Sequence, residues 1–129
     1  MMNHATCTFQ IDSWDEATWD ERDGIKLAKA HVTKTFHGEL EGHSTVELLT
    51  AVGATEAARA YVGLERIVGR LHDRSGSFVL LHAASANGIN WTIVPELATH
   101  ELRGLRGSAQ ITIDADGGHT LTLDYELAA

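Results

Sequence analysis

Residues 77–94 read Ser-Phe-Val-Leu-Leu-His-Ala-Ala-Ser-Ala-Asn-Gly-Ile-Asn-Trp-Thr-Ile-Val, and this stretch decides the fold class. Two runs rich in Val, Ile, Leu and aromatic residues flank Asn87-Gly88. Both turn residues tolerate positive φ, which makes Asn-Gly between apolar runs a strong signal for a β-hairpin. Pro95, the only proline, ends the second run, because proline cannot donate to a strand ladder. The stretch therefore predicts two antiparallel strands.

The rest of the chain after Gly24 also alternates between apolar and polar residues in short runs. This period of two is typical of strands with one buried face. Turns are expected at residues 38–42, which contain two glycines, and at residues 116–118. The further runs expected to be strands are residues 26–37, 43–52, 110–113 and 119–127.

Two more stretches are ambiguous between helix and strand. Residues 55–61 favour a helix by propensity, but Gly63 and Gly69 follow closely and would weaken a helix interior. The same glycines suit a strand that bends sharply. In residues 99–107, two glycines again disfavour a helix. With both stretches counted as strands there are about eight, which predicts an antiparallel barrel or a sandwich and does not decide between them.

Size and charge exclude several classes of protein. At 129 residues the chain fits a single domain, residues 1–129. Its net charge of −8 argues against binding to nucleic acid or to an anionic membrane, since both need a basic face. No apolar run approaches the ~20 residues of a membrane span, and residues 1–7 lack the parts of an export signal, so we expect a cytoplasmic protein. Cys7 is the only cysteine, which excludes an internal disulfide bond.

The acidic excess is concentrated in residues 12–24, where six carboxylates face Arg22 as the only base. Trp14 and Trp19 interleave with these acids, so the segment is not expected to be a loose linker. We expect one short helix or an ordered loop at residues 13–24, capped by Ser13, with both indoles anchored on the body of the protein. The order of ligands in an EF-hand calcium loop is absent.

Several motifs together resemble a known family. They are residues 36–42 (FHGELEG), 62–69 (VGLERIVG) and 76–82 (GSFVLLH), with residues 9–14 and 121–125 towards the two ends. In order and spacing they are similar to the bacterial domain-of-unknown-function family 3224. The resemblance implies an all-β fold, a closed eight-stranded antiparallel barrel like that of allene oxide cyclase, with a calycin-like interior that can hold a small apolar ligand. It implies no reaction.

A barrel of this size has its hydrophobic core inside, so an ionisable residue that points inward is a candidate site residue. Glu65 shares a strand face with Gly63 and Gly69, whose missing side chains leave space. If this face is inward, Glu65 is buried, with a raised pKa suited to acid/base catalysis. His82 follows Phe78 and Leu80 on one face of the next strand and is its expected partner. The alternative places Glu65 outside, paired with a basic neighbour, and His82 as an ordinary core residue.

Further residues are expected to line the interior and bind a ligand. Glu47 is placed inward beside Glu65 as a second carboxylate, and the others are Tyr61, Phe78, Leu80 and Trp91. The alternative for Trp91 is simple core packing. The eight histidines form no His-x-His or His-x-x-x-His pair, so we expect no metal.

Three kinds of function remain open. The first is binding of a small apolar ligand, uncharged or cationic, inside the barrel. The second is a cofactor-free isomerase or cyclase resembling allene oxide cyclase, with Glu65 as the acid/base. The third is a structural assembly module with a solid core. No cofactor is expected, and a homo-oligomer is an additional expectation. The presence of an open interior cavity distinguishes the first two from the third.

Overall fold

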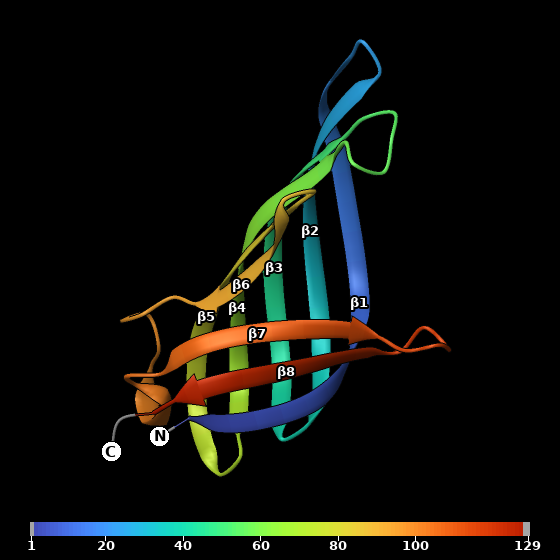
Figure 1. The fold of residues 1–129 in the computed structure, drawn as a ribbon. Helices are drawn as coiled ribbons and strands as arrows, with labels where there is room; N and C mark the ends of the chain where they lie inside the picture. Colours follow the sequence, from blue (N-terminus) through green and yellow to red (C-terminus); the bar gives the residue numbers. More distant parts are fainter. Residues whose placement is uncertain (1, 128–129) are drawn as a thin grey trace.

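The computed structural model describes residues 2–127, which form a closed barrel of eight antiparallel strands (Figure 1). Each strand pairs with the next in the chain, and the last pairs with the first. The strands are β1 (Asn3–Arg22), β2 (Ile25–Gly38), β3 (Leu40–Val52), β4 (Arg59–Leu71), β5 (Arg74–Ser85), β6 (Gly88–Ile93), β7 (Arg106–Ile113) and β8 (His119–Glu126). A single 3-10 turn, η1 (His100–Leu102), is the only helical element of the described residues. The all-β barrel is confirmed, and within residues 2–127 no helix is long and apolar enough to span a membrane.

The hairpin expected from residues 77–94 is formed by β5 and β6, with a small shift of the turn. Ser85 pairs with Gly88, so Ala86 and Asn87 form the two-residue connection. Gly88 has a φ of 134° and is the first residue of β6. The glycine therefore supplies an unusual backbone angle at the strand entry rather than inside the turn.

The helix or loop expected at residues 13–24 is wrong, because this segment is the second half of β1. Residues 3–9 of β1 pair with β8 and residues 7–22 pair with β2, with register shifts between Ile11 and Ser13 and between Thr18 and Asp20. Such bulges let a long strand bend without leaving its ladder. Asp23 and Gly24, both at positive φ, make the tight turn into β2.

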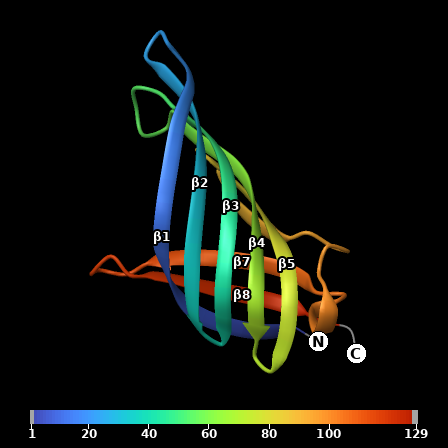
Figure 2. The same ribbon diagram turned by 180° about the vertical axis from the view of Figure 1, so that it is seen from behind.

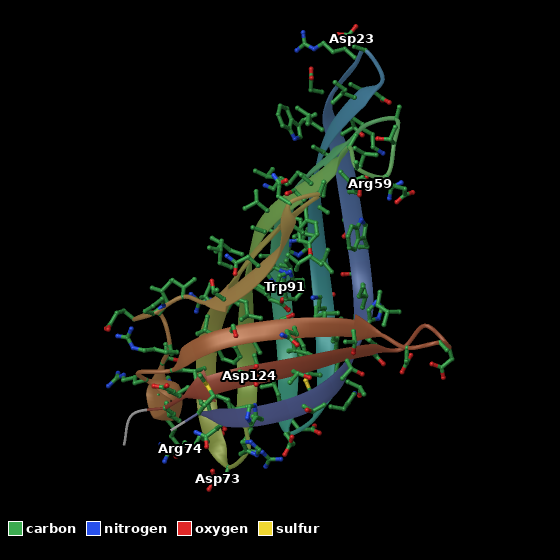
Figure 3. All side chains as sticks on the ribbon, viewed as in Figure 1. Asp23, Arg59, Asp73, Arg74, Trp91 and Asp124 are labelled. Carbon is green, nitrogen blue, oxygen red and sulfur yellow. The ribbon has the colours of Figure 1, made fainter. Side chains whose placement is uncertain are left out.

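The end of the β1–β2 hairpin stands beyond the rest of the barrel, with Asp23 at its tip (Figure 3). We call this projecting part the arm, and the two ends of the barrel the arm end and the η1 end. The expectation that both indoles are anchored on the body is wrong for Trp19, which is 62% exposed, whereas Trp14 is 49% exposed and borders the barrel interior. The arm consists of two strands only, so it has no opposing layer to cover Trp19.

The stretch at residues 99–107, expected to be a strand, is mostly a turn. Only its last two residues belong to β7. The chain instead folds through η1, and Leu102 and Leu105 are fully buried in the core at this end of the barrel. Figure 2 shows η1 beside the chain ends, at the opposite end from the arm. Two leucines three residues apart enter the core together because a tight turn places them on one side.

Between β6 and β7 the barrel closes through a short contact. Only Thr92 and Ile93 of β6 pair with β7, through Ser108 and Gly107. The rest of β7 pairs with β8 alone. The stretch at residues 55–61, counted as a strand from the sequence, is likewise only partly a strand. Residues 54–58 form a bend and a turn, and β4 begins at Arg59.

Candidate functional site

The interior holds a cavity of about 230 Å³ to which all eight strands contribute. It borders both clusters of buried apolar residues, the larger one towards the η1 end and the smaller one around Ala30, Val32, Val46 and Leu48. Its lining is mainly aromatic and aliphatic, and consists of Phe9, Ile11, Trp14, Val32, Lys34, Val46, Leu48, Thr50, Tyr61, His82, Trp91, Ile111 and His119. Such a concave, mostly apolar space with a few polar groups is typical of a small-molecule site.

A buried polar cluster lies beside this cavity and consists of Glu65, His82, Lys34 and Ser44. Glu65 is 1% exposed and His82 is 2% exposed, with His82 Nε2 2.8 Å from Glu65 Oε1. Lys34 Nζ donates to the same oxygen at 3.4 Å, and Ser44 Oγ donates to Oε2 at 2.5 Å. Both carboxylate oxygens of Glu65 are thus engaged by inward-facing residues of the three neighbouring strands β2, β3 and β5.

Strand register explains why these side chains meet. Lys34 lies directly opposite Ser44, and Val46, two residues beyond Ser44, lies opposite Glu65. His82 lies opposite Gly63, two residues before Glu65. Diagonal neighbours on one face are within reach of long side chains.

The contact between His82 and Glu65 is close but is not an aligned hydrogen bond. The 2.8 Å separation is short, but the ring N–H is not directed at the oxygen, and Nε2 has no hydrogen-bond partner among the described residues. The imidazole is also held by Trp91, whose ring centroid is 3.7 Å away. Trp91 Nε1 in turn donates to the Tyr61 hydroxyl at 3.2 Å.

The expectation of a raised pKa for Glu65 is wrong. Burial, the largest single influence, would raise the pKa of this carboxyl. The contact with His82, the charge of Lys34 and the hydrogen bond from Ser44 together outweigh burial, so the pKa of Glu65 lies below its usual value. Glu65 is therefore a stably ionised carboxylate that organises its neighbours.

The expected site residues are only partly brought together. His82, Tyr61 and Trp91 line the cavity, whereas Glu65 lies behind Lys34 and His82 and does not. Phe78 and Leu80 are fully buried in the larger apolar cluster and do not line the cavity either. Glu47 is wrong as an inward residue: it points outwards and pairs with His31 at 2.7 Å. The outward direction follows from alternation, since Val46 and Leu48 on either side of it are buried.

Lys34 and Ser44 are not among the site residues predicted from the sequence, although strand alternation already indicates that Lys34 points inwards. Lys34 lies between Val32 and Phe36 at period two, so the alternation that buries these two residues also points the lysine inwards. The lysine is 7% exposed, and its Nζ lies 4.7 Å from the ring centroid of Phe9 and 5.5 Å from that of Trp91. Cation–π attraction adds to the ion pair in holding the ammonium group there. Within residues 2–127, no group of three or more His, Cys, Asp or Glu side chains is arranged to hold a metal ion.

The lowered pKa of Glu65 predicts a specific acid sensitivity. A group with a lowered pKa contributes stability that is present above its unfolded pKa, about 4.3 for glutamate, and is lost as the pH falls through the folded value. We expect the stability advantage of wild type over Glu65→Gln to be constant near neutral pH and to shrink below about pH 4. Urea denaturation of both proteins from neutral to acid pH measures this difference in the free energy of unfolding. The contributions of exposed carboxylates such as Asp12 are common to both proteins and cancel in the difference. A constant difference throughout would contradict the prediction.

Two comparisons place the chain among known proteins. Residues 5–125 match the family described as protein of unknown function (DUF3224). A crystal structure of a protein with unknown function from the same family, from Shewanella oneidensis MR-1, is similar with a TM-score of 0.86 and 30% sequence identity, over 100% of both chains. No curated protein matches the chain. With a family match over nearly its whole length and a full-length structural relative from that family, the chain belongs to DUF3224.

Proposed function

We propose that this barrel binds a small, largely apolar molecule in its interior cavity. The observation that carries the proposal is the open space of about 230 Å³ lined by side chains from all eight strands. An interior that keeps this space favours binding over an assembly module with a solid core. The cavity is smaller than the 300–1,000 Å³ of drug-sized pockets, which restricts the ligand to a compact molecule of roughly ten to twelve non-hydrogen atoms.

The lining supports binding with modest affinity. Rigid rings of Trp91, Tyr61 and Phe9 present apolar area at low cost in side-chain entropy. Burial contributes roughly 25 cal/mol per Å² of apolar surface, from which the loss of translational and rotational freedom is deducted. For a ligand of this size a micromolar dissociation constant, about 8 kcal/mol, is the expected scale.

Binding is expected to change the tryptophan fluorescence through Trp91. Titration with the monoterpene ketone carvone should give a saturable change in the wild type. In Trp91→Phe this change should be reduced, because one of the two indoles that line the cavity is removed, and the remaining change should come from Trp14. Trp19→Phe is the matched control, since Trp19 lies exposed on the arm and does not line the cavity. Absence of saturable binding for carvone and related terpenes, measured by calorimetry as well, would contradict the proposal.

The second candidate is a cofactor-free isomerase or cyclase of the allene oxide cyclase kind. The position of His82 favours it, because the imidazole borders the cavity and is held by a buried carboxylate. The acid/base group is then His82, and Glu65 is a positioning residue rather than the group that touches substrate. In such a reaction the imidazole takes a proton from a carbon next to a carbonyl, and the resulting enolate recovers a proton from the imidazolium.

This chemistry can be tested apart from binding. Carvone in D₂O with the protein should exchange its enolisable hydrogens faster than in buffer, as followed by NMR. His82→Gln should abolish the acceleration, and Glu65→Gln should reduce it. Saturable binding without any acceleration would favour the carrier over the enzyme.

We also propose that the protein self-associates through a surface on the outside of the barrel. The outer faces of β3, β4 and β5 carry four exposed apolar side chains in contact by register, Leu49, Val62, Leu64 and Leu81. Exposed apolar patches of this kind mark interaction surfaces. Lys29, Glu47 and Arg66 place both signs of charge around this patch, so it is complementary to a second copy of itself.

We therefore expect a homodimer through this face. Light scattering after size exclusion should give twice the mass of one chain, and Leu64→Lys should give the mass of one chain. Thr122→Lys, on the polar outer face of β8, should leave the dimer intact. A monomeric wild type at high protein concentration would contradict this prediction.

A further inference from the structure

The ammonium group of Lys34 has more hydrogen-bonding capacity than the protein uses. A lysine has three N–H donors. Among residues 2–127, Nζ donates only to Glu65 Oε1, and at the long distance of 3.4 Å. The side chain nevertheless lies in the interior and lines the cavity between the rings of Phe9 and Trp91. The other N–H donors of Nζ are therefore surrounded by these two aromatic rings and the cavity.

The cavity is polarised along its depth. Lys34 and His82 are buried and form its inner part, whereas Ile11 and Trp14 are about half exposed and form its mouth. A ligand that fills this space places one end against the ammonium group and the other against apolar side chains. An oxygen atom at the inner end would satisfy a buried donor, and a hydrocarbon at the same place would not.

The charge of the buried cluster determines which kind of ligand oxygen Lys34 can bind favourably. Glu65 already balances the charge of Lys34, and its own oxygens are engaged by Ser44 and His82. An ionised ligand head group would add a second negative charge to a single buried lysine, and an uncompensated buried charge is costly. A carbonyl or hydroxyl oxygen accepts the spare hydrogen bond without adding charge.

We infer that the ligand of this cavity is an uncharged apolar molecule with one acceptor oxygen, a ketone, aldehyde or alcohol, whose oxygen binds Lys34 Nζ at the inner end. This inference rests on the proposed function and narrows it to one chemical class. His82 lines the same cavity as Lys34.

Three terpenes with the same carbon skeleton test the inference: limonene, which has no oxygen, carvone, which has a carbonyl, and perillate, which has a carboxylate. Calorimetric titration of the wild type should give about tenfold tighter binding for carvone than for limonene, and weaker binding for perillate than for carvone. Tenfold corresponds to 1.4 kcal/mol, close to the lower end of the range for one hydrogen bond that involves a charged group.

Variants then assign the preference to Lys34. The double variant Lys34→Met with Glu65→Gln removes both charges together, so no uncompensated charge stays buried, and the carvone-to-limonene ratio should fall to about one. Glu65→Gln alone keeps the ammonium group and should keep the preference. Lys29→Met, on the exposed face of the same strand, is the control and should bind all three terpenes as the wild type does.

The outcomes separate the two proposals. Equal binding of limonene and carvone to the wild type overturns the inference and leaves the proposed apolar site intact. Tighter binding of perillate than of carvone overturns it in favour of an anionic ligand. Binding of none of the three overturns the proposed function together with the inference. These wild-type titrations decide the inference even if the double variant does not fold.

Discussion

Glu65→Ala is expected to lower the free energy of unfolding by about 3–5 kcal/mol, the cost of removing one partner of a buried ion pair. The substitution leaves the ammonium group of Lys34 inside the barrel without its counter-charge. It also removes the acceptor of the Ser44 hydroxyl and the partner of His82. Urea denaturation at neutral pH, followed by far-UV circular dichroism, measures the loss.

Two further variants show whether the loss comes from the cluster. Glu65→Gln should cost less than Glu65→Ala, because the amide fills the same volume and still accepts a hydrogen bond from Ser44. Glu47→Ala removes the exposed carboxylate paired with His31 on the outer face of β3. Exposed pairs contribute about 0–1 kcal/mol, so this control should be close to wild type. Similar losses for Glu65→Ala and Glu47→Ala would contradict the buried cluster.

Gly69→Ala is expected to be the second strongly destabilising change, with a loss of about 3 kcal/mol, at the upper end for overpacking. Gly69 pairs with Gly42 across β3 and β4. A Cβ atom at residue 69 would lie 2.0 Å from the carbonyl oxygen of Glu41 and 2.8 Å from Cα of Gly42. Both are backbone atoms, so the two strands must move apart and lose ladder hydrogen bonds.

The control for this variant is its neighbour. Val68 is exposed on the outer face of β4, and Val68→Ala should stay within about 0.5 kcal/mol of wild type, as usual for surface substitutions. Thermal melting of both variants beside the wild type distinguishes them. A Gly69→Ala protein as stable as Val68→Ala would show that β3 and β4 do not approach as closely as the structure places them.

Strand alternation in the sequence predicted most of the barrel strands and showed which neighbours share a face with each of two key residues. Within β4, Glu65 shares a face with Ile67, and within β5, His82 shares a face with Phe78 and Leu80. Because the side-chain period of a strand is two, one buried apolar residue determines the direction of its neighbours at i±2. The same reasoning applies to Lys34 between Val32 and Phe36.

In residues 13–24, the local turn residues indicate the structure better than the composition does. Six acidic residues and two tryptophans suggested a separate ordered segment, yet Asp23-Gly24 is one of the dipeptides that favour a two-residue hairpin turn. Pairing with β2 then extends β1 to Arg22. Nothing within residues 13–22 indicates this partner, because the hydrogen bonds of a strand are made to another segment of the chain.

The sequence by itself therefore determined most of the strand pattern and most of the turns, since these follow from neighbours along the chain, and it left the inward direction of Glu65 open. Only the tertiary structure decided that Lys34 and Ser44 join Glu65, and that a cavity remains beside them. Gly63 and Gly69 illustrate the difference: they were expected to leave space, but the backbone of β3 occupies the positions that their side chains would take. The open space lies instead where side chains of all eight strands meet. Its size depends on closure of the barrel and on the combined volume of residues far apart in the chain, which no local pattern contains.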